Sequence, residues 1–203
     1  MNLNILKPGK AVDSAFEKPS FLLALALVLL PVLASVAGRV VYGVAVEAND
    51  VIYGIIMAYI SFFIPVLVVF VLGMVVDRQK TKGKFIGLFS ALSLARLVSL
   101  AIVVLSLVTL PLVLSPEAMS LGLQAGKSAG YAMMLSQISQ FVESNPNAIN
   151  WPVFNAFIAV GLILTLWGIY LIYKSVKKLT ESKPIAAILI TIVAFIIAGA
   201  LQV

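Results

Sequence analysis

Residues 159–195 read A-V-G-L-I-L-T-L-W-G-I-Y-L-I-Y-K-S-V-K-K-L-T-E-S-K-P-I-A-A-I-L-I-T-I-V-A-F, and this stretch decides the fold of the chain. A first apolar run ends in an aromatic group and then a basic one, and a second apolar run begins at Pro184; the two groups are Trp167, Tyr170, Tyr173 and Lys174, Lys177, Lys178. Aromatic side chains with a polar tip prefer the headgroup region, and lysines in short loops favour the cytoplasmic side. The stretch therefore predicts a membrane hairpin whose loop, residues 174–183, is cytoplasmic.

The composition is that of a membrane protein. Hydrophobic residues make up 62% of the chain and charged residues 11%, whereas a soluble domain has roughly 45–50% and about 25%. The net charge of +6 lies in short loops, where cations set orientation and meet anionic lipid, so it indicates no nucleic-acid partner. The chain has no Cys and no His, which removes thiol chemistry and the commonest general base and metal ligand. We expect no enzymatic activity, no metal and no cofactor.

Five apolar runs predict an all-α polytopic membrane protein, a bundle of five transmembrane helices in a single domain of residues 1–203. The expected spans are about 19–42, 51–76, 86–114, 152–173 and 184–203, and about 20 apolar residues suffice to cross a bilayer. Residues 2–18 form a short amphipathic segment that we expect on the membrane surface. Residues 85–114 exceed one span, so residues 85–96 are either an interfacial helix or the start of span three.

The region between spans three and four predicts an extracytoplasmic helical segment. Ser115-Pro116-Glu117 has the features of a helix start, with a capping side chain, a proline at the first position and an acid near the positive end of the helix dipole. Asn145-Pro146-Asn147 predicts its end. Inside it, Gly122, Gly126 and Gly130 fall four apart, which would place three candidate packing glycines on one helix face. The alternative is that these glycines mark local flexibility.

The loop cations orient the chain, because cytoplasmic loops carry the excess of Lys and Arg. Only Arg39 and Lys127 fall on the side opposite the hairpin loop, and the other side has Lys7, Lys10, Lys18, Arg78, Lys80, Lys82, Lys84, Lys174, Lys177, Lys178 and Lys183. We therefore expect a multi-pass protein of the cell membrane, with its N-terminus cytoplasmic and its C-terminus extracytoplasmic. The candidate residues for binding anionic lipid headgroups or a partner are Arg78, Lys80, Lys82, Lys84, Arg96, Lys174, Lys177 and Lys178.

Arg96 is the only ionisable residue near the interior of a predicted span, where charged groups are costly and often functional. Ser90, Ser93 and Ser99 lie at three-residue steps around it, so a polar ridge could follow one side of this helix. One interpretation is an anion or lipid-headgroup site at Arg96. The other is that Arg96 ends an interfacial helix and extends its guanidinium to the headgroups.

Several stretches together are similar to one membrane-protein family. They are K-P-S-F at residues 18–21, K-G-K-F-I-G-L-F at 82–89, L-W-G-I-Y-L-I-Y-K-S-V-K-K at 166–178 and K-P-I-A-A-I at 183–188. With these patterns the chain resembles the Yip (Ypt-interacting protein) family of five-span membrane proteins in its short prokaryotic or archaeal form. The resemblance implies a role in membrane organisation or in recruiting proteins such as Rab-type GTPases, often in complexes with other members. Leu6-Lys7-Pro8-Gly9 lacks the acid of the family's D-L-x-G-P-like motif, so no GTPase-binding residue is assigned.

Two functions are open at this point. The first is a non-enzymatic membrane scaffold that binds anionic headgroups or a partner protein and forms a homo- or hetero-oligomer. The second is a channel or permease for a small solute, with a path between helices kinked at Pro31, Pro65 and Pro111. No acidic residue lies inside a predicted span, so a proton relay or cation-coupled carrier of the carboxylate type lacks its parts. The scaffold is therefore the favoured hypothesis.

Overall fold

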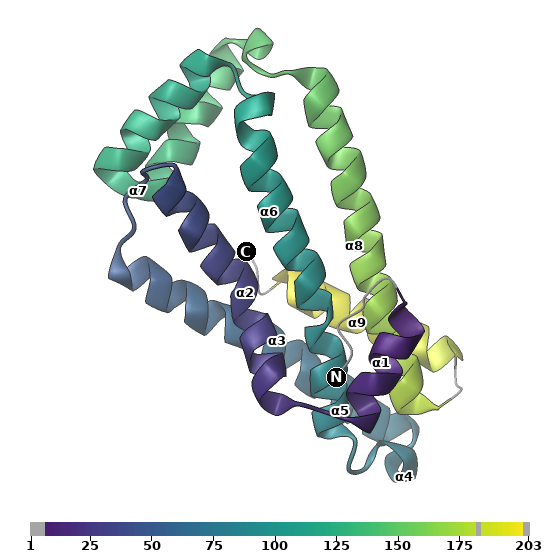
Figure 1. Ribbon diagram of the computed structural model, residues 1–203. Helices are drawn as coiled ribbons and strands as arrows, with labels where there is room; N and C mark the ends of the chain where they lie inside the picture. The colour runs from purple at the N-terminus through teal and green to yellow at the C-terminus, as the bar shows by residue number, and fades with distance from the viewer. Residues whose placement is uncertain (1–6, 182–183, 201–203) are drawn as a thin grey trace. The chain divides into compact units, whose positions relative to one another are not determined.

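The computed structural model describes residues 7–181 and 184–200, and helices follow one another along both ranges (Figure 1). The elements are α1 Pro8–Glu17, α2 Phe21–Val41, α3 Ala48–Val76, α4 Arg78–Thr81, α5 Phe85–Ser93, α6 Ala95–Val113, α7 Pro116–Ser144, the short 3-10 helix η1 Pro146–Ala148, α8 Trp151–Thr180 and α9 Pro184–Ala200. Predictions for residues 2–6, for Lys183 and for residues 201–203 lie outside the described residues.

The prediction of an all-α polytopic membrane protein is confirmed. Four stretches are long and apolar enough to cross a bilayer: α2, α3, the pair α5 and α6 over Phe85–Val113, and α8. Each overlaps one predicted span, and α8 extends past the predicted end at residue 173 as far as Thr180. The fifth predicted span corresponds to α9, whose 17 residues are at the short end of what hydrocarbon requires.

Prolines lie inside several of the apolar helices, and each leaves one backbone carbonyl without its helical hydrogen bond. For one of these carbonyls the structure supplies another donor. Pro111 lies inside α6 and has no N–H to bond to the carbonyl four residues earlier, that of Leu107. The Tyr42 hydroxyl, just beyond the end of α2, donates to this Leu107 carbonyl. A released backbone group in an apolar helix is costly without a partner, so Tyr42 stabilises the proline-containing end of α6.

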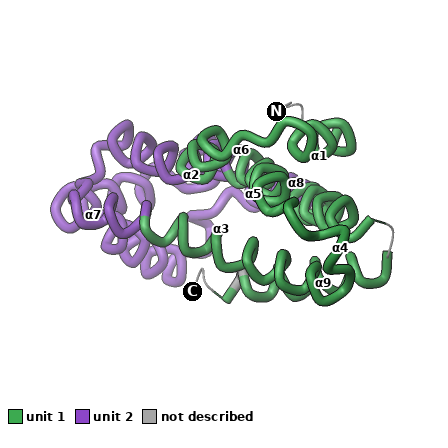
Figure 2. The backbone as a smooth tube through the Cα atoms, turned by 90° about the horizontal axis from the view of Figure 1, so that it is seen from below, with its two compact units in different colours: residues 1–30, 56–99, 165–203 green, residues 31–55, 100–164 purple. Residues whose placement is uncertain are grey.

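The described chain divides into two compact units, which Figure 2 colours separately. Unit 1 comprises residues 1–30, 56–99 and 165–203, and unit 2 comprises residues 31–55 and 100–164. The helices α2, α3, α6 and α8 each contribute residues to both units. The single domain of residues 1–203 stays a prediction.

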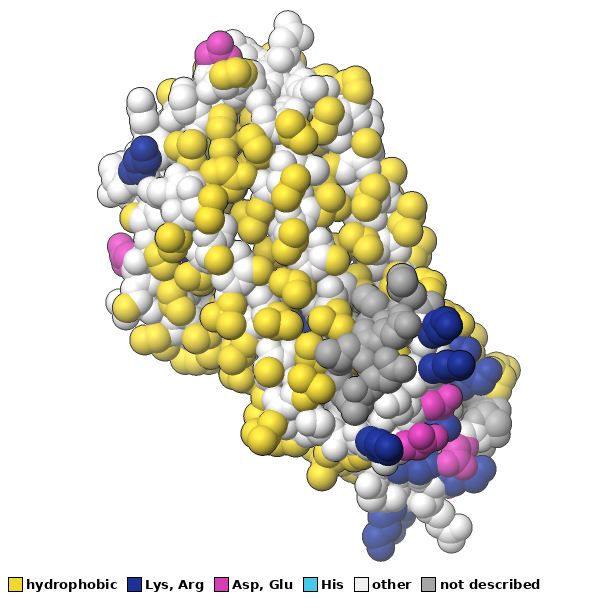
Figure 3. Space-filling model, in the orientation of Figure 1, with side chains coloured by type: hydrophobic (Ala, Val, Ile, Leu, Met, Phe, Trp, Pro, Cys, Tyr) yellow, Lys and Arg dark blue, Asp and Glu magenta, His cyan; other side chains and the backbone are white. Residues whose placement is uncertain are grey.

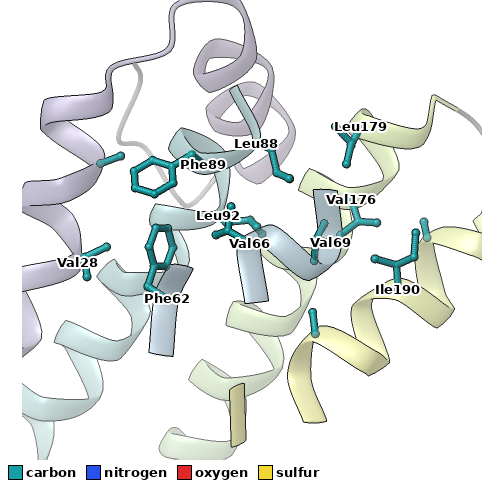
Figure 4. Packing of buried hydrophobic residues seen from close by; sticks show 13 residues of the cluster. Val28, Phe62, Val66, Val69, Leu88, Phe89, Leu92, Val176, Leu179 and Ile190 are labelled. Carbon is teal, nitrogen blue, oxygen red and sulfur yellow. The ribbon is translucent and has the colours of Figure 1, made fainter. Parts of the chain in front are cut away.

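The core of unit 1 is a cluster of aromatic and branched side chains. Its buried members come from α2, α3, α5, α8 and α9, and Figure 4 shows them pointing toward one another. Phe89 of α5 has the most ring contacts, with its centroid 5.0 Å from that of Phe62 and 4.9 Å from that of Phe21. Edge-to-face and offset pairs at such distances stabilise a core beyond simple burial. The cluster fixes α5 among longer helices.

The amphipathic helix predicted near the N-terminus is present as α1, but its apolar face is buried in the protein. Ala11, Val12 and Ala15 pack in one cluster with Ala91 and Leu94, from α5 and the residue after it. The chain after α1 is also anchored to α5, because the backbone N–H of Ser20 donates to the Ser90 hydroxyl at 3.1 Å. Seven of the nine residues of α5 are buried, so α5 is an internal helix of unit 1 that α1 covers.

Unit 2 contains the segment predicted between spans three and four. Ser115 caps α7 as predicted, since its side chain accepts from the N–H of Ala118 at 3.2 Å, and Asn145 follows its end. The predicted helical segment between them is present but is not one continuous helix. Gly130 takes φ 82° and ψ −174°, a conformation open almost only to glycine. The chain therefore bends there, and α7 consists of two helical halves.

Candidate functional site

Three charged segments that lie far apart in the sequence meet on unit 1. They are α1, the short helix α4 with its flanking loop, and the C-terminal end of α8. We call the basic surface the set Arg78, Lys80, Lys82, Lys84, Lys174, Lys177 and Lys178. Figure 3 shows Lys and Arg side chains gathered with acidic ones in this part of unit 1, at the lower right of the view. The structure thus brings together the two basic loops that the sequence identified.

Two carboxylates connect the three segments. Asp13 of α1 pairs with Lys178 of α8, with the Oδ1 and Nζ atoms 2.9 Å apart. Glu181, just after α8, accepts a hydrogen bond from Lys84 Nζ and lies 3.9 Å from Lys80 Nζ. All of these side chains are partly exposed, and exposed ion pairs contribute little to stability. Their effect is to fix the position of the basic groups.

Local backbone features set the ends of these segments. The Asp77 side chain caps α4 by accepting from the N–H of Lys80 at 3.1 Å. Gly83 follows with φ +81°, a left-handed conformation that glycine adopts without strain. At the C-terminal end of α8, the next residue, Glu181, has φ 34°. This left-handed backbone ends the helix, and the Glu181 carboxylate lies close to Lys84.

The basic groups around Glu181 change its titration. The hydrogen bond and the charge of Lys84 lower the pKa of Glu181 below its ordinary value, and the charges of Lys80 and Lys178 act in the same direction. A depressed carboxyl pKa means that the stabilising contribution is present above the unfolded-state pKa and is lost as the pH falls through the folded-state pKa. Glu181 is therefore ionised at neutral pH and holds Lys80 and Lys84 in place.

The remaining cations of the basic surface have no carboxylate partner. Within residues 7–181 and 184–200, Arg78, Lys82 and Lys177 form no ion pair. Lys174 places its Nζ over the Tyr170 ring, 5.3 Å from the centroid. Uncompensated cations grouped on one surface attract anions and raise their local concentration.

The aromatic residues that precede these lysines form a short row along α8. The ring centroids of Trp167 and Tyr170 are 5.8 Å apart, and those of Tyr170 and Tyr173 are 6.5 Å apart. Trp and Tyr are enriched at headgroup depth, where one part of the ring system is apolar and another is wet. The row is consistent with the predicted aromatic belt beside the lysines.

Arg96 lies on unit 1 but makes no contact with the basic surface. Its Nη2 donates to the Ser61 hydroxyl at 3.3 Å, and its guanidinium carbon is 5.4 Å from the centroid of the Phe62 ring. Ser61 precedes Pro65 by one turn in α3. The structure therefore places Arg96 as a link between the start of α6 and the proline-containing part of α3.

The serines predicted to flank Arg96 are used elsewhere. Ser90 accepts from the backbone N–H of Ser20, and the Ser93 hydroxyl donates to the Ser90 carbonyl at 2.8 Å. Both side chains belong to buried residues and satisfy backbone groups, so they do not form a continuous polar ridge with Arg96. Ser61, which does contact Arg96, comes from another helix, and nothing in the sequence near Arg96 indicates it.

We predict that Arg96→Lys is tolerated. An ammonium on a flexible stem can also donate to the Ser61 hydroxyl and lie near the Phe62 ring, so the melting temperature in detergent and the yield should remain close to those of the wild type. Proteoliposomes of the wild-type protein should show no anion flux. Reproducible flux that Arg96→Lys abolishes at an unchanged protein level would instead support the permease hypothesis.

The three candidate packing glycines of α7 lie in unit 2 and have different surroundings. A Cβ on Gly122 would lie 2.5 Å from Ile138 Cγ1, and one on Gly126 would lie 3.1 Å from Val44 Cγ2 and 3.2 Å from Met134 Cβ. A Cβ on Gly130 would meet no atom within 4 Å. Gly122 and Gly126 therefore allow the second half of α7 to approach the first, and Gly130 is the bend between the halves.

No group of three or more acidic side chains within residues 7–181 and 184–200 is placed to hold a metal ion. The basic surface offers hydrogen-bond donors and positive charge. It is suited to binding an anion.

Comparison with known proteins gives one match. The family model described as the Yip1 domain matches residues 3–203. No curated protein and no solved structure matches the chain.

Proposed function

The chain belongs to the Yip1 domain family, and on this premise we propose that it is a non-enzymatic membrane scaffold that holds anionic ligands at the basic surface of unit 1. The observation that carries the proposal is the joining of three distant segments by Asp13 and Glu181. This arrangement leaves Arg78, Lys82 and Lys177 without ion pairs among the described residues. A surface of positioned but uncompensated cations favours binding of anionic headgroups and of acidic protein segments.

The distribution of cations supports the proposed orientation. The described cations expected on the cytoplasmic side all belong to unit 1: Lys7, Lys10, Lys18, Arg78, Lys80, Lys82, Lys84, Lys174, Lys177 and Lys178. Arg39 and Lys127, expected on the other side, belong to unit 2, as does α7. Because cytoplasmic loops carry the excess of cations, we propose that the protein lies in the cell membrane with its basic surface facing the cytoplasm. In this orientation the N-terminus is cytoplasmic and the C-terminus is extracytoplasmic.

The partner hypothesis predicts that charge on the loop around α4 controls which proteins copurify. We expect the amount of membrane-associated partner protein that is cross-linked to the chain and copurifies with it to fall severalfold in the double variant Arg78→Gln, Lys82→Gln. The reason is that each removed cation weakens the attraction to an acidic protein surface. The measurement is quantitative mass spectrometry after purification of the full chain from its native membrane.

The matched control is Lys127→Gln, which removes an exposed cation of unit 2. Its copurifying proteins should match those of the wild type. If the double variant retains the same partners in the same amounts at 0.15 M salt, the basic surface does not recruit them and the scaffold proposal fails in this form.

A further inference from the structure

A groove in unit 1 lies between α1 and the C-terminal end of α8. It has a volume of about 410 Å³ and is lined by Gly9, Val12 and Asp13 on one side and by Lys174, Lys177, Lys178 and Glu181 on the other. The four residues of α8 and its end are spaced by three, one and three positions, so they share one helix face. This face turns toward α1, since Lys178 pairs with Asp13 across the groove.

The two acidic groups in the lining are already compensated. Asp13 accepts from Lys178 at 2.9 Å, and Glu181 accepts from Lys84 and faces Lys80. Lys174 and Lys177 are left without a carboxylate partner among the described residues. An ammonium group has three N–H donors and no acceptor, so these two lysines offer the groove about two positive charges and several free donors.

The groove also has apolar surface and lies beside the aromatic row. Val12 is buried at its base, and Gly9 has no atom within 4 Å of the place where a Cβ would lie, so the α1 side is open. Tyr170 and Tyr173 precede Lys174 on α8 and stack on each other. Tyrosines beside lysines at the end of an apolar helix are typical of headgroup depth, so we expect the groove at the level of the polar part of a lipid.

We propose that this groove binds the phosphomonoester headgroup of an anionic membrane lipid, with Lys174 and Lys177 as its ligands. A phosphomonoester carries about two negative charges at neutral pH, which matches the two uncompensated ammonium groups, whereas a phosphodiester carries one. Lys178 is a positioning residue, because its pair with Asp13 holds α1 against α8. This inference rests on the scaffold function proposed above and assigns one defined site within the basic surface.

The test compares two pairs of lysine and arginine changes on the same surface. The full chain is reconstituted in phosphatidylcholine nanodiscs that contain phosphatidic acid, and native mass spectrometry counts the phosphatidic acid molecules retained. Lys174→Gln, Lys177→Gln should bind about tenfold more weakly, because charge-assisted hydrogen bonds to the phosphate are lost. Arg78→Gln, Lys82→Gln, which belong to the basic surface but lie outside the groove lining, should weaken binding by less than Lys174→Gln, Lys177→Gln does. Lys127→Gln, an exposed change in unit 2, should leave retention unchanged, and Lys174→Arg, Lys177→Arg should retain it.

Two outcomes would overturn the site. We call Lys174→Gln, Lys177→Gln the groove pair and Arg78→Gln, Lys82→Gln the loop pair. If both pairs lose phosphatidic acid binding equally, the lipid is attracted diffusely to the whole basic surface. If the groove pair binds phosphatidic acid as the wild type does, its two lysines are not ligands. A third arm titrates inorganic phosphate into nanodiscs without phosphatidic acid, and binding as tight as that of the lipid would assign the groove to free phosphate instead. Partner copurification is read out separately with the loop pair, so failure of the site and failure of the scaffold function are distinguishable.

Discussion

Replacing Gly126 with leucine is expected to lower the free energy of unfolding by about 1 to 3 kcal/mol, the range for overpacking a well-filled site. Gly126 lies in the first half of α7, and a Cβ there would be 3.1 Å from Val44 Cγ2 and 3.2 Å from Met134 Cβ. The Met134 atom is attached directly to the backbone, so it cannot move aside unless the second half of α7 moves. The larger leucine side chain should therefore separate the two halves. The melting temperature in detergent measures the effect.

The matched control is Gln124→Leu, at an exposed position in the same half of α7. In Gly126→Leu, the gain in helix propensity when leucine replaces glycine is less than about 1 kcal/mol. The control Gln124→Leu tests whether an added leucine on α7 is harmless where its side chain meets solvent. We expect Gln124→Leu to leave the melting temperature nearly unchanged. If Gly126→Leu also leaves it unchanged, the halves of α7 do not pack through Gly126.

The two halves of α7 illustrate what the sequence could not predict. Glycines four apart fit a helix-packing face, and the same residues fit a bend, because glycine serves both purposes equally well. The cap at Ser115 and the end at Asn145 were predictable, since each has a local chemical signature within a few residues. The bend at Gly130 depends on Val44, Met134 and Ile138 filling the space between the halves, which is a property of the folded chain.

The same limit applies to the candidate site. Apolar run length and loop charge predicted the helices and the basic loops, because both are local properties of the sequence. The pairing of Asp13 with Lys178 joins α1 to the end of α8, far apart in the sequence, and no periodicity reports such a contact. An amphipathic pattern predicts that α1 has an apolar face but is the same whether that face meets lipid or protein. The structure shows it against α5.

The contact between α1 and α5 gives the second large prediction. A Cβ on Gly87 would lie 2.8 Å from Phe16 Cδ1 and 3.3 Å from Phe16 Cα. The ring can turn, but the Cα atom belongs to the backbone of α1, so a leucine at Gly87 should displace the helix. At about 1 to 3 kcal/mol for such overpacking, the population with α1 detached should rise roughly five- to 150-fold. Trypsin cleavage after Lys10, which is followed by Ala11, should accelerate by a similar factor.

Gly9→Leu is the control for this experiment, because it adds the same side chain to α1 at a position with open space around it. Its cleavage rate should match that of the wild type, which would show that bulk on α1 alone does not expose the segment.

Detachment of α1 also separates Asp13 from Lys178 and removes one wall of the groove, so Gly87→Leu should weaken phosphatidic acid retention although every lysine is intact. Faster cleavage with unchanged retention would mean that α1 contributes nothing to headgroup binding, whereas unchanged cleavage would mean that α1 does not dock through Gly87.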